Sequence, residues 1–283
     1  MLTVGSIFHK GDKLVVDERR GVFRKADAEN LVNRAAEVAE SVGMEFALDV
    51  IVPSAGAVPS YLGFAASTVG TVLLDPLSKE AALEGLRYAS EIGLQSKLVY
   101  NSISLKTSRE ILEAMAEHRV KRAVLMAFSY DLALTSTGRV RAAEELLATT
   151  KGVVEEAWVD TAVLDIPSVG VALKAAKLLK EKHGVLVGCS PHNAVSGWRA
   201  ARKLPLTVRR ALSASLCALA ASQGVDFVIV GPLHYVLITA PCMAAAMAAE
   251  AQVRLEEGEE VSEAHPRYKL PGISLESYKG LQL

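Results

Sequence analysis

The sequence is poor in aromatic residues and has no excess of charge of either sign. Aromatic residues make up 5% of its 283 residues, which argues against the base-stacking surfaces of single-strand nucleic-acid binders. The formal net charge is -1, so the chain lacks the basic field that nucleic-acid binding usually requires. We therefore expect no nucleic-acid partner.

Cysteines and long apolar runs are also scarce. Cys189, Cys217 and Cys242 lie far apart and form no C-x-x-C pair, which argues against a disulfide framework or a structural zinc site and favours a reducing compartment. The N-terminus has no apolar core of the signal-peptide type. The most apolar late stretch, residues 236–249, is interrupted by Pro241 and is too short to span a bilayer. We expect a cytoplasmic protein in which this stretch is a buried, Ala-rich helix.

Eight short apolar runs recur along the chain, each nearly continuous, as expected for parallel strands covered on both faces. They span residues 2–8, 46–52, 71–75, 96–102, 122–129, 156–163, 185–190 and 226–231. Amphipathic segments, such as 26–43, 78–93 and 168–184, lie between them and end in a glycine suited to a helix C-terminus. Eight strand–helix units favour an α/β fold with a single (β/α)8 TIM barrel over a doubly wound open sheet, which usually has fewer strands.

The chain shows no linker or shift of composition before residue 257. Residues 1–256 are therefore predicted to form the barrel. Residues 257–283 are punctuated by proline and glycine, and we expect them to form a C-terminal tail that packs on the barrel or on a partner.

Polar residues follow several of the predicted strands, at the end of a barrel where active sites form. These residues are Asp49, Asp75, Asn101, Ser129, Asp160 and residues 190–193. Taken singly, an Asp or Asn at such a place is often the N-cap of the next helix. Several at one barrel mouth need a common ligand or considerable hydration. Two carboxylates and two carboxamides suit a heterocycle with a guanidine-like edge, a pterin more than a purine.

The chain also contains an ordered set of segments that resembles one protein family. The segments are GSIFHKGDKLVVDERRGVF, LLDPLS, YNSIS, VDTAV, GCSPHNAVSGW and DFVIVGP. Over nearly all of residues 3–250, the chain resembles the H subunit of tetrahydromethanopterin S-methyltransferase. It is similar more broadly to the pterin-binding barrels of methyltetrahydrofolate:corrinoid methyltransferases and, more distantly, to dihydropteroate synthase.

The resemblance implies a homodimeric barrel that moves the N5-methyl group of a methyl-tetrahydropterin to cobalt(I). The pterin is methyl-tetrahydromethanopterin or methyl-tetrahydrofolate, and the cobalt belongs to a cobalamin carried by a corrinoid protein partner. The reverse transfer is equally compatible with it. The resemblance also allows peripheral docking to a membrane methyltransferase complex.

The resemblance assigns roles to individual residues. Asp160 would hold the 2-amino and N3–H edge of the pterin, and Asp75 and Asn101 would contact the opposite, pyrazine side. Asn193 matches an Asn placed near N5, although it is also a candidate N-cap for a helix that begins near residue 195. Ser129 completes the predicted pterin-binding set, and we predict that Asn193 and Asp75 are catalytic.

Methyl transfer requires a proton or a hydrogen bond at N5, because the leaving group would otherwise be a strongly basic amide anion. A donor that strengthens only as charge shifts at N5 lowers the barrier. Asparagine cannot give up a proton, so water or an acid must complete the step, and Asp75 and Asp160 are both candidates. His9, His192 and His234 lack zinc-ligand spacing. We therefore predict no metal site and give the histidines structural or hydrogen-bonding roles.

Two other functions remain open. A dihydropteroate-synthase-like enzyme would need a Lys or Arg at a strand end for its diphosphate leaving group, and none is clearly placed. A catalytically silent pterin-binding or scaffold protein of a methyltransferase complex is the third hypothesis.

The basic segment 198–210 has two interpretations. It either attracts an acidic ligand tail or partner, or it is a solvated helix face.

Overall fold

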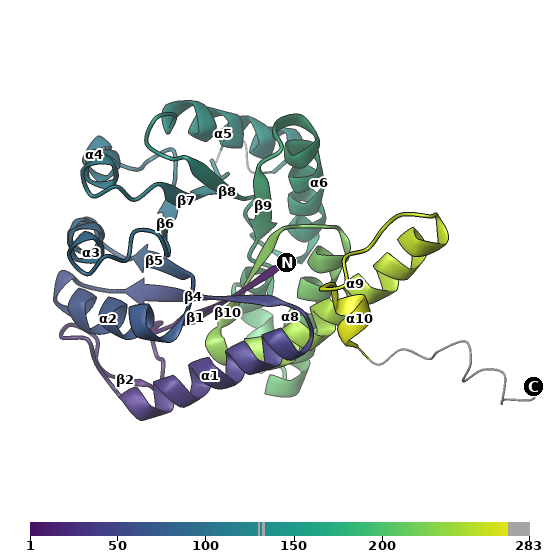
Figure 1. Ribbon diagram of the computed structural model, residues 1–283, viewed down its shortest axis with the longest axis horizontal. Helices are drawn as coiled ribbons and strands as arrows, with labels where there is room; N and C mark the ends of the chain where they lie inside the picture. Colours follow the sequence, from purple (N-terminus) through teal and green to yellow (C-terminus); the bar gives the residue numbers. More distant parts are fainter. Residues whose placement is uncertain (130, 132–133, 271–283) are drawn as a thin grey trace, which may run out of the picture.

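The chain folds as a closed barrel of eight parallel strands (Figure 1). The computed structural model describes residues 1–129, 131 and 134–270. Around the barrel, the strands follow the order β1 (Leu2–Ile7), β10 (Phe227–Pro232), β9 (Leu186–Cys189), β8 (Glu156–Asp160), β7 (Arg122–Met126), β6 (Leu98–Ile103), β5 (Val72–Pro76) and β4 (Glu45–Val52). All eight correspond to predicted runs, so the (β/α)8 barrel is confirmed and the open sheet is excluded.

Helices surround the strands on the outside of the barrel (Figure 1). They are α1 (Lys25–Ser41), α2 (Val58–Thr68), α3 (Lys79–Glu91), α4 (Arg109–Glu117), α5 (Ser136–Thr149), α6 (Ile166–His183), α7 (His192–Ser196), α8 (Leu206–Ser222), α9 (Val236–Glu256) and α10 (Pro266–Lys269). Gly43, Gly93 and Gly184 follow the ends of α1, α3 and α6 with φ of 75°, 71° and 62°. The predicted glycine stops are thus confirmed, because only glycine adopts this backbone conformation without strain.

A short hairpin interrupts the connection between β1 and α1. Strands β2 (Val15–Asp17) and β3 (Val22–Phe23) pair antiparallel, with Val15 opposite Phe23. The sequence analysis missed this hairpin, because strands of two or three residues carry too little alternation to be distinguished from a loop.

The barrel interior is filled by a layer of buried apolar side chains. Its members are Val4, Ala47, Leu73, Val99, Val124, Trp158, Phe227 and Ile229. Strand β9 contributes Gly188 instead, where an added Cβ would lie 2.6 Å from the ring of Phe227. The missing side chain leaves room for that ring, and the layer forms the floor beneath the mouth of the barrel.

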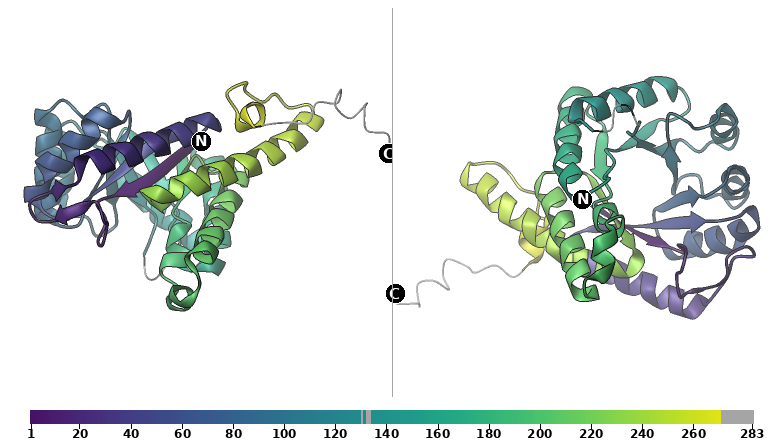
Figure 2. Two further views of the ribbon diagram at one scale, coloured as in Figure 1. Left: turned by 90° about the horizontal axis from the view of Figure 1, so that it is seen from below. Right: turned by 180° about the vertical axis from the view of Figure 1, so that it is seen from behind.

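Helix α9 extends past the barrel wall (Figure 2) and packs against α8 and α1. Among the described residues, the helical stretch Leu233–Glu256 is long and apolar enough to cross a membrane, by length and composition alone. It is longer than the predicted apolar stretch, because the helix continues through Pro241. Core helices of soluble proteins pass the same test, and Met243 and Ala244 are fully buried against the barrel.

The first part of the predicted tail returns to α9. Arg254 Nε donates to Glu259 Oε2 at 2.8 Å, and Arg267 Nε donates to Gln252 Oε1 at 2.8 Å. Helix α10 packs against α9 (Figure 2), and the second of these hydrogen bonds joins the two helices. Residues 271–283 of the predicted tail lie outside the described residues, and the domain boundary at 256/257 remains a prediction.

Candidate active site

A cavity of about 380 Å³ opens at the carboxyl ends of the strands. Side chains alternate between the two sides of a strand, so residues two positions beyond the interior layer face the barrel axis again. Every strand, or for β9 the residue just after it, supplies such a residue to the cavity, namely Ser6, Asp49, Asp75, Asn101, Met126, Asp160, Ser190 and Gly231. His9, Ser102, His192 and Asn193 complete its polar lining. The structure therefore brings Asp75, Asn101, Asp160 and Asn193 together, while their ligand contacts remain predictions.

Helix capping does not account for the polar strand ends. Ser78 caps α3 through its hydroxyl group, which accepts from the Ala81 N–H at 3.1 Å. Ser108 and Asp165 occupy the N-cap positions of α4 and α6. The capping hypothesis for Asp75, Asn101 and Asp160 is therefore wrong, and their side chains line the cavity instead.

Asn193 does not cap the helix that follows β9 either. Helix α7 begins at His192, and its N-cap position is taken by Pro191. Asn193 thus lies inside the first turn, and its carbonyl oxygen accepts from Gly197 N at 2.9 Å. Its side chain is exposed at the cavity wall.

Ser129 lies outside the central cavity. Strand β7 ends at Met126, three residues earlier than predicted, and the chain then leaves the barrel wall. Ser129 lines an adjoining cavity of about 380 Å³, together with Phe128 and Ser104. Met126 lines both cavities. Ser129 therefore does not share the position of the other predicted pterin-binding residues.

Asp49 and Asp75 form a pair of carboxyl groups on neighbouring strands. Asp49 is 2% exposed and accepts hydrogen bonds from Ser6 Oγ at 2.7 Å and from Asn101 Nδ2 at 3.0 Å. Burial raises the pKa of Asp49 despite these two donors. Burial and the charge of Asp49 raise the pKa of Asp75 well above its ordinary value. Because both donors favour the ionised form of Asp49, the proton of the pair belongs on Asp75.

Asp160 stands on the opposite side of the barrel as a buried hydrogen-bond acceptor. Its Oδ1 accepts from Ala162 N at 2.7 Å and its Oδ2 accepts from Ser190 Oγ at 3.2 Å. Burial raises the pKa of Asp160, whereas these hydrogen bonds and the charge of Arg139 lower it. Asp160 thus has three groups that favour its ionised form, and Asp75 has none of them.

Arg139, on α5, supports the loop that carries this arrangement. It is 1% exposed, and its Nη1 donates to Ala162 O at 2.7 Å. Ala162 adopts φ of 54° and so turns its N–H toward Asp160. The sequence analysis missed Arg139, because an arginine on an amphipathic helix is ordinarily a surface residue.

His192 is held at the cavity wall in its neutral form. Its Nδ1 lies 2.9 Å from Ser213 Oγ, and its ring packs edge-on against Tyr235. Burial, together with the nearby His234 and His9, lowers the pKa of His192 to about 4. A structural or hydrogen-bonding role fits these contacts. Among the described residues, no group of three or more His, Cys, Asp or Glu side chains is placed to hold a metal ion.

The absence of a side chain at Gly231 leaves room for the ring of His192, and we predict that Gly231→Ala disrupts the site. An added Cβ would lie 2.4 Å from His192 Cδ2, and the residue has φ of 81°. Gly224→Ala is the matched control, because Gly224 has φ of 72° but open space around its Cα. Both variants lose about 1–2 kcal/mol from backbone strain. Thermal unfolding should show a clearly larger loss for Gly231→Ala, and equal losses would contradict this account.

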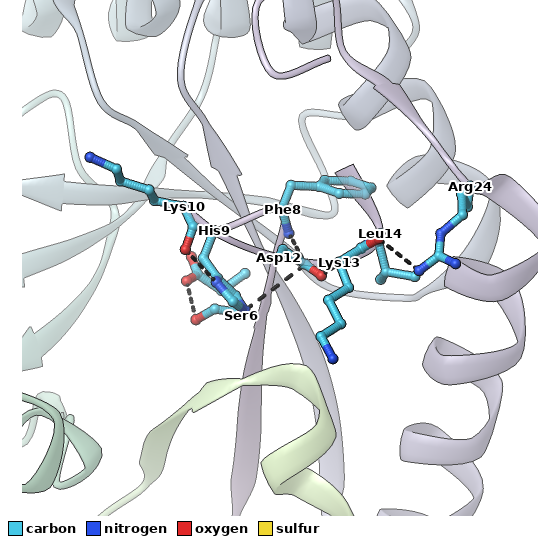
Figure 3. Close-up of polar contacts among 9 residues, drawn as sticks. Ser6, Phe8, His9, Lys10, Asp12, Lys13, Leu14 and Arg24 are labelled. Atoms are coloured by element: carbon cyan, nitrogen blue, oxygen red, sulfur yellow. Dashed lines mark hydrogen bonds and ion pairs between the residues drawn. The ribbon is translucent and has the colours of Figure 1, made fainter. Parts of the chain in front are cut away.

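The loop after β1 brings His9 to the cavity edge (Figure 3). Asp12 organises this loop, since its carboxylate accepts from Phe8 N and from Leu14 N, both at 3.0 Å. His9 Nε2 lies 4.0 Å from Asp12 Oδ2. Phe8 has φ of 64°, and its ring stacks on Tyr61. Tertiary packing thus fixes the conformation of a loop that the sequence left undefined.

The basic segment lies away from the cavity lining. Arg199, Arg202 and Lys203 are exposed in a short 3₁₀ helix, and Arg209 and Arg210 are half-buried at the start of α8. The described residues that line the central cavity include no Lys or Arg. The diphosphate-binding cation expected of a dihydropteroate-synthase-like enzyme is therefore not part of this lining.

A family model described as the MtrH component of tetrahydromethanopterin S-methyltransferase matches residues 1–262. The chain belongs to the MtrH family. The H subunit of tetrahydromethanopterin S-methyltransferase from Methanothermobacter thermautotrophicus is 28% identical over 282 residues, with 94% of this chain and 90% of that protein covered. The H subunit of the putative mtx methyltransferase from Methanosarcina acetivorans is 29% identical over 277 residues, with 90% and 87% covered. The resemblance stated from the sequence is thereby confirmed.

Solved structures show the same fold at low identity. Yersinia pestis dihydropteroate synthase superposes with a TM-score of 0.57 at 14% identity, covering 88% of this chain and 92% of that chain. Xanthomonas albilineans dihydropteroate synthase with 4-aminobenzoic acid gives a TM-score of 0.58 at 16% identity, covering 91% and 93%. These similarities support the barrel fold alone. They carry no information about the reaction, for which the family match and the residues of the cavity are the relevant observations.

Proposed function

We propose that this member of the MtrH family transfers the N5-methyl group of a methyl-tetrahydropterin to a cobalt(I) corrinoid on a partner protein, or in the reverse direction. The observation that carries the proposal is the ring of strand-end residues around one cavity, in which Asp160 lies across the barrel from Asp49 and Asp75. A heterocycle with donors on one edge and a basic nitrogen on the other fits this distribution of polar groups.

Asp160 binds the guanidine-like edge of the pterin in this proposal. Its buried, ionised carboxylate accepts two parallel hydrogen bonds from the 2-amino group and N3–H. The Ala162 N–H and the Ser190 hydroxyl group already satisfy part of its acceptor capacity and fix its orientation. The carboxylate is therefore positioned before the ligand arrives, and little conformational entropy is lost on binding.

Asp75 supplies the acid and Asn193 the hydrogen bond at N5. The raised pKa of Asp75 keeps a proton in the cavity, and water carries that proton to the ring nitrogen as the C–N bond breaks. The Asn193 carboxamide lies on an exposed turn of the cavity wall and orients the water or N5 itself. Cobalt(I) supplies the nucleophile, so the chain contributes binding, orientation and proton transfer.

A binding and transfer assay tests the proposal. Purified protein is titrated with methyl-tetrahydromethanopterin and methyl-tetrahydrofolate by calorimetry, and methyl transfer to free cob(I)alamin is followed by absorbance. Asn193→Ala should retain binding and lose about 100-fold in rate, as for the removal of one transition-state donor. Ser196→Ala, a neighbouring exposed residue on α7, is the control.

Each outcome separates one hypothesis from another. No binding of either pterin would remove the pterin assignment. Binding without transfer by the wild-type protein would leave the scaffold hypothesis in place. An unchanged rate in Asn193→Ala would remove its role at N5.

We also propose that the protein is a homodimer in the cytoplasm and that it docks with a corrinoid protein at the barrel mouth. Light scattering tests the dimer.

A further inference from the structure

The hydrogen bonds around Asp49 decide which way the Asn101 amide is turned. Asp49 is almost fully buried and accepts from Ser6 Oγ at 2.7 Å and from Asn101 Nδ2 at 3.0 Å. An ionised carboxylate has no hydrogen to donate, so Asn101 can bond to Asp49 only through its NH₂ group. A flipped amide would place its oxygen against the Asp49 carboxylate, where two acceptors face each other with no hydrogen between them. Asn101 lines the cavity, and its carbonyl oxygen is therefore the atom that can accept a hydrogen bond from a ligand there.

The strand order decides which edge of a bound pterin meets Asn101. Strand β8 has β9 on one side and, on the other, β7 followed by β6. If Asp160 of β8 holds the 2-amino and N3–H edge and Asn193 after β9 faces N5, then the edge that carries N8 points toward Asn101 of β6. This step rests on the proposed function.

The chemistry of N8 depends on the oxidation state of the ring. In a tetrahydropterin N8 carries a hydrogen and is a donor, whereas in a fully oxidised pterin N8 is a bare ring nitrogen and an acceptor. We propose that Asp49 and Asn101 together form an acceptor site that selects the reduced tetrahydropterin and rejects the oxidised ring. Asp49 is a positioning residue in this arrangement, since it acts through the Asn101 amide.

The test compares two tail-free probes, 6-methyl-tetrahydropterin and 6-methylpterin, titrated into the full chain by calorimetry without oxygen. The oxidised probe should bind about 10- to 100-fold more weakly, as expected when a buried acceptor faces another acceptor. Asp49→Asn frees the amide to turn, so the ratio of the two affinities should fall by about tenfold. Glu45→Gln, at the other end of β4 and outside the cavity lining, is the control and should keep the ratio.

Asn101→Ala is the second variant, because it removes the acceptor and leaves the bond between Ser6 and Asp49 intact. It should also bring the two affinities close together. The reduced ring is puckered and the oxidised ring is flat, but a preference based on shape alone would survive in both variants and would overturn the inference. Equal wild-type affinities would overturn it as well. If neither probe binds, or if Asp160→Ala binds both normally, the proposed function itself fails.

Discussion

Replacing Asp160 by asparagine should weaken tetrahydropterin binding by about 100- to 10,000-fold. The substitution keeps the shape of the side chain but removes the charge and places an NH₂ group among the donors of the ligand. Two charge-assisted hydrogen bonds are lost, each worth about 1.5–3 kcal/mol, and each 1.4 kcal/mol corresponds to a factor of ten. Calorimetric titration of Asp160→Asn measures the effect directly.

The same carboxylate predicts how binding depends on pH. Its pKa is raised by burial, and only the ionised form accepts both hydrogen bonds, so affinity should fall as the pH falls through that raised pKa. Arg139 on α5 and Cys189 on β9 are the nearby titratable groups, and Arg139 opposes the rise. Glu45→Gln, at the start of β4 and so at the other end of the barrel, is the control. If Asp160→Asn bound the pterin as tightly as that control, the assignment of this edge would be wrong.

Asp75→Asn should lower the rate of methyl transfer by about 100-fold or more while leaving pterin affinity nearly unchanged. General acids in enzymes typically contribute factors of this size, and the amide cannot release a proton. The wild-type rate should fall as the pH rises through the raised pKa of Asp75, because the acid is then lost. The variant should lack this alkaline fall. Separate measurement of kcat and KM across pH distinguishes the two behaviours.

The same substitution should stabilise the fold. Burial and the charge of Asp49 raise the folded-state pKa of Asp75 well above its ordinary value. The contribution of Asp75 to stability is therefore complete below the ordinary pKa of an aspartate and is lost as the pH rises through the raised folded-state pKa. Asp75→Asn removes this loss and should therefore raise the free energy of unfolding at neutral pH, measured by chemical denaturation. Lower stability together with lower activity would show that Asp75 is a structural residue rather than a strained acid.

Much of the site could be predicted because the parallel strands of a barrel lie side by side in sequence order, so that their carboxyl ends meet at one mouth. Asp75, Asn101 and Asp160 were recognised as strand ends, and each lies two residues beyond the interior layer. The prediction failed where the strand end was misjudged. Extending β7 from Met126 to residue 129 selected a side chain that lines another cavity.

Other features of the site had no signal along the chain. Ser6 and Asp49 are 43 residues apart, and nothing in either segment indicates that one donates to the other. From the sequence Arg139 is expected to be an exposed helix residue, although it is buried behind the loop that follows β8. These residues acquire their roles only from neighbours that are distant in sequence.

The sequence alone determined the number of barrel strands and the end of the barrel at which their last polar residues meet, because apolar periodicity and the alternation of side chains are local properties of the chain. The tertiary structure decided which carboxyl group holds the proton and which way the Asn101 amide turns. Both depend on burial and on distances between side chains from different strands. Such electrostatic and hydrogen-bonding effects arise only once the barrel has closed.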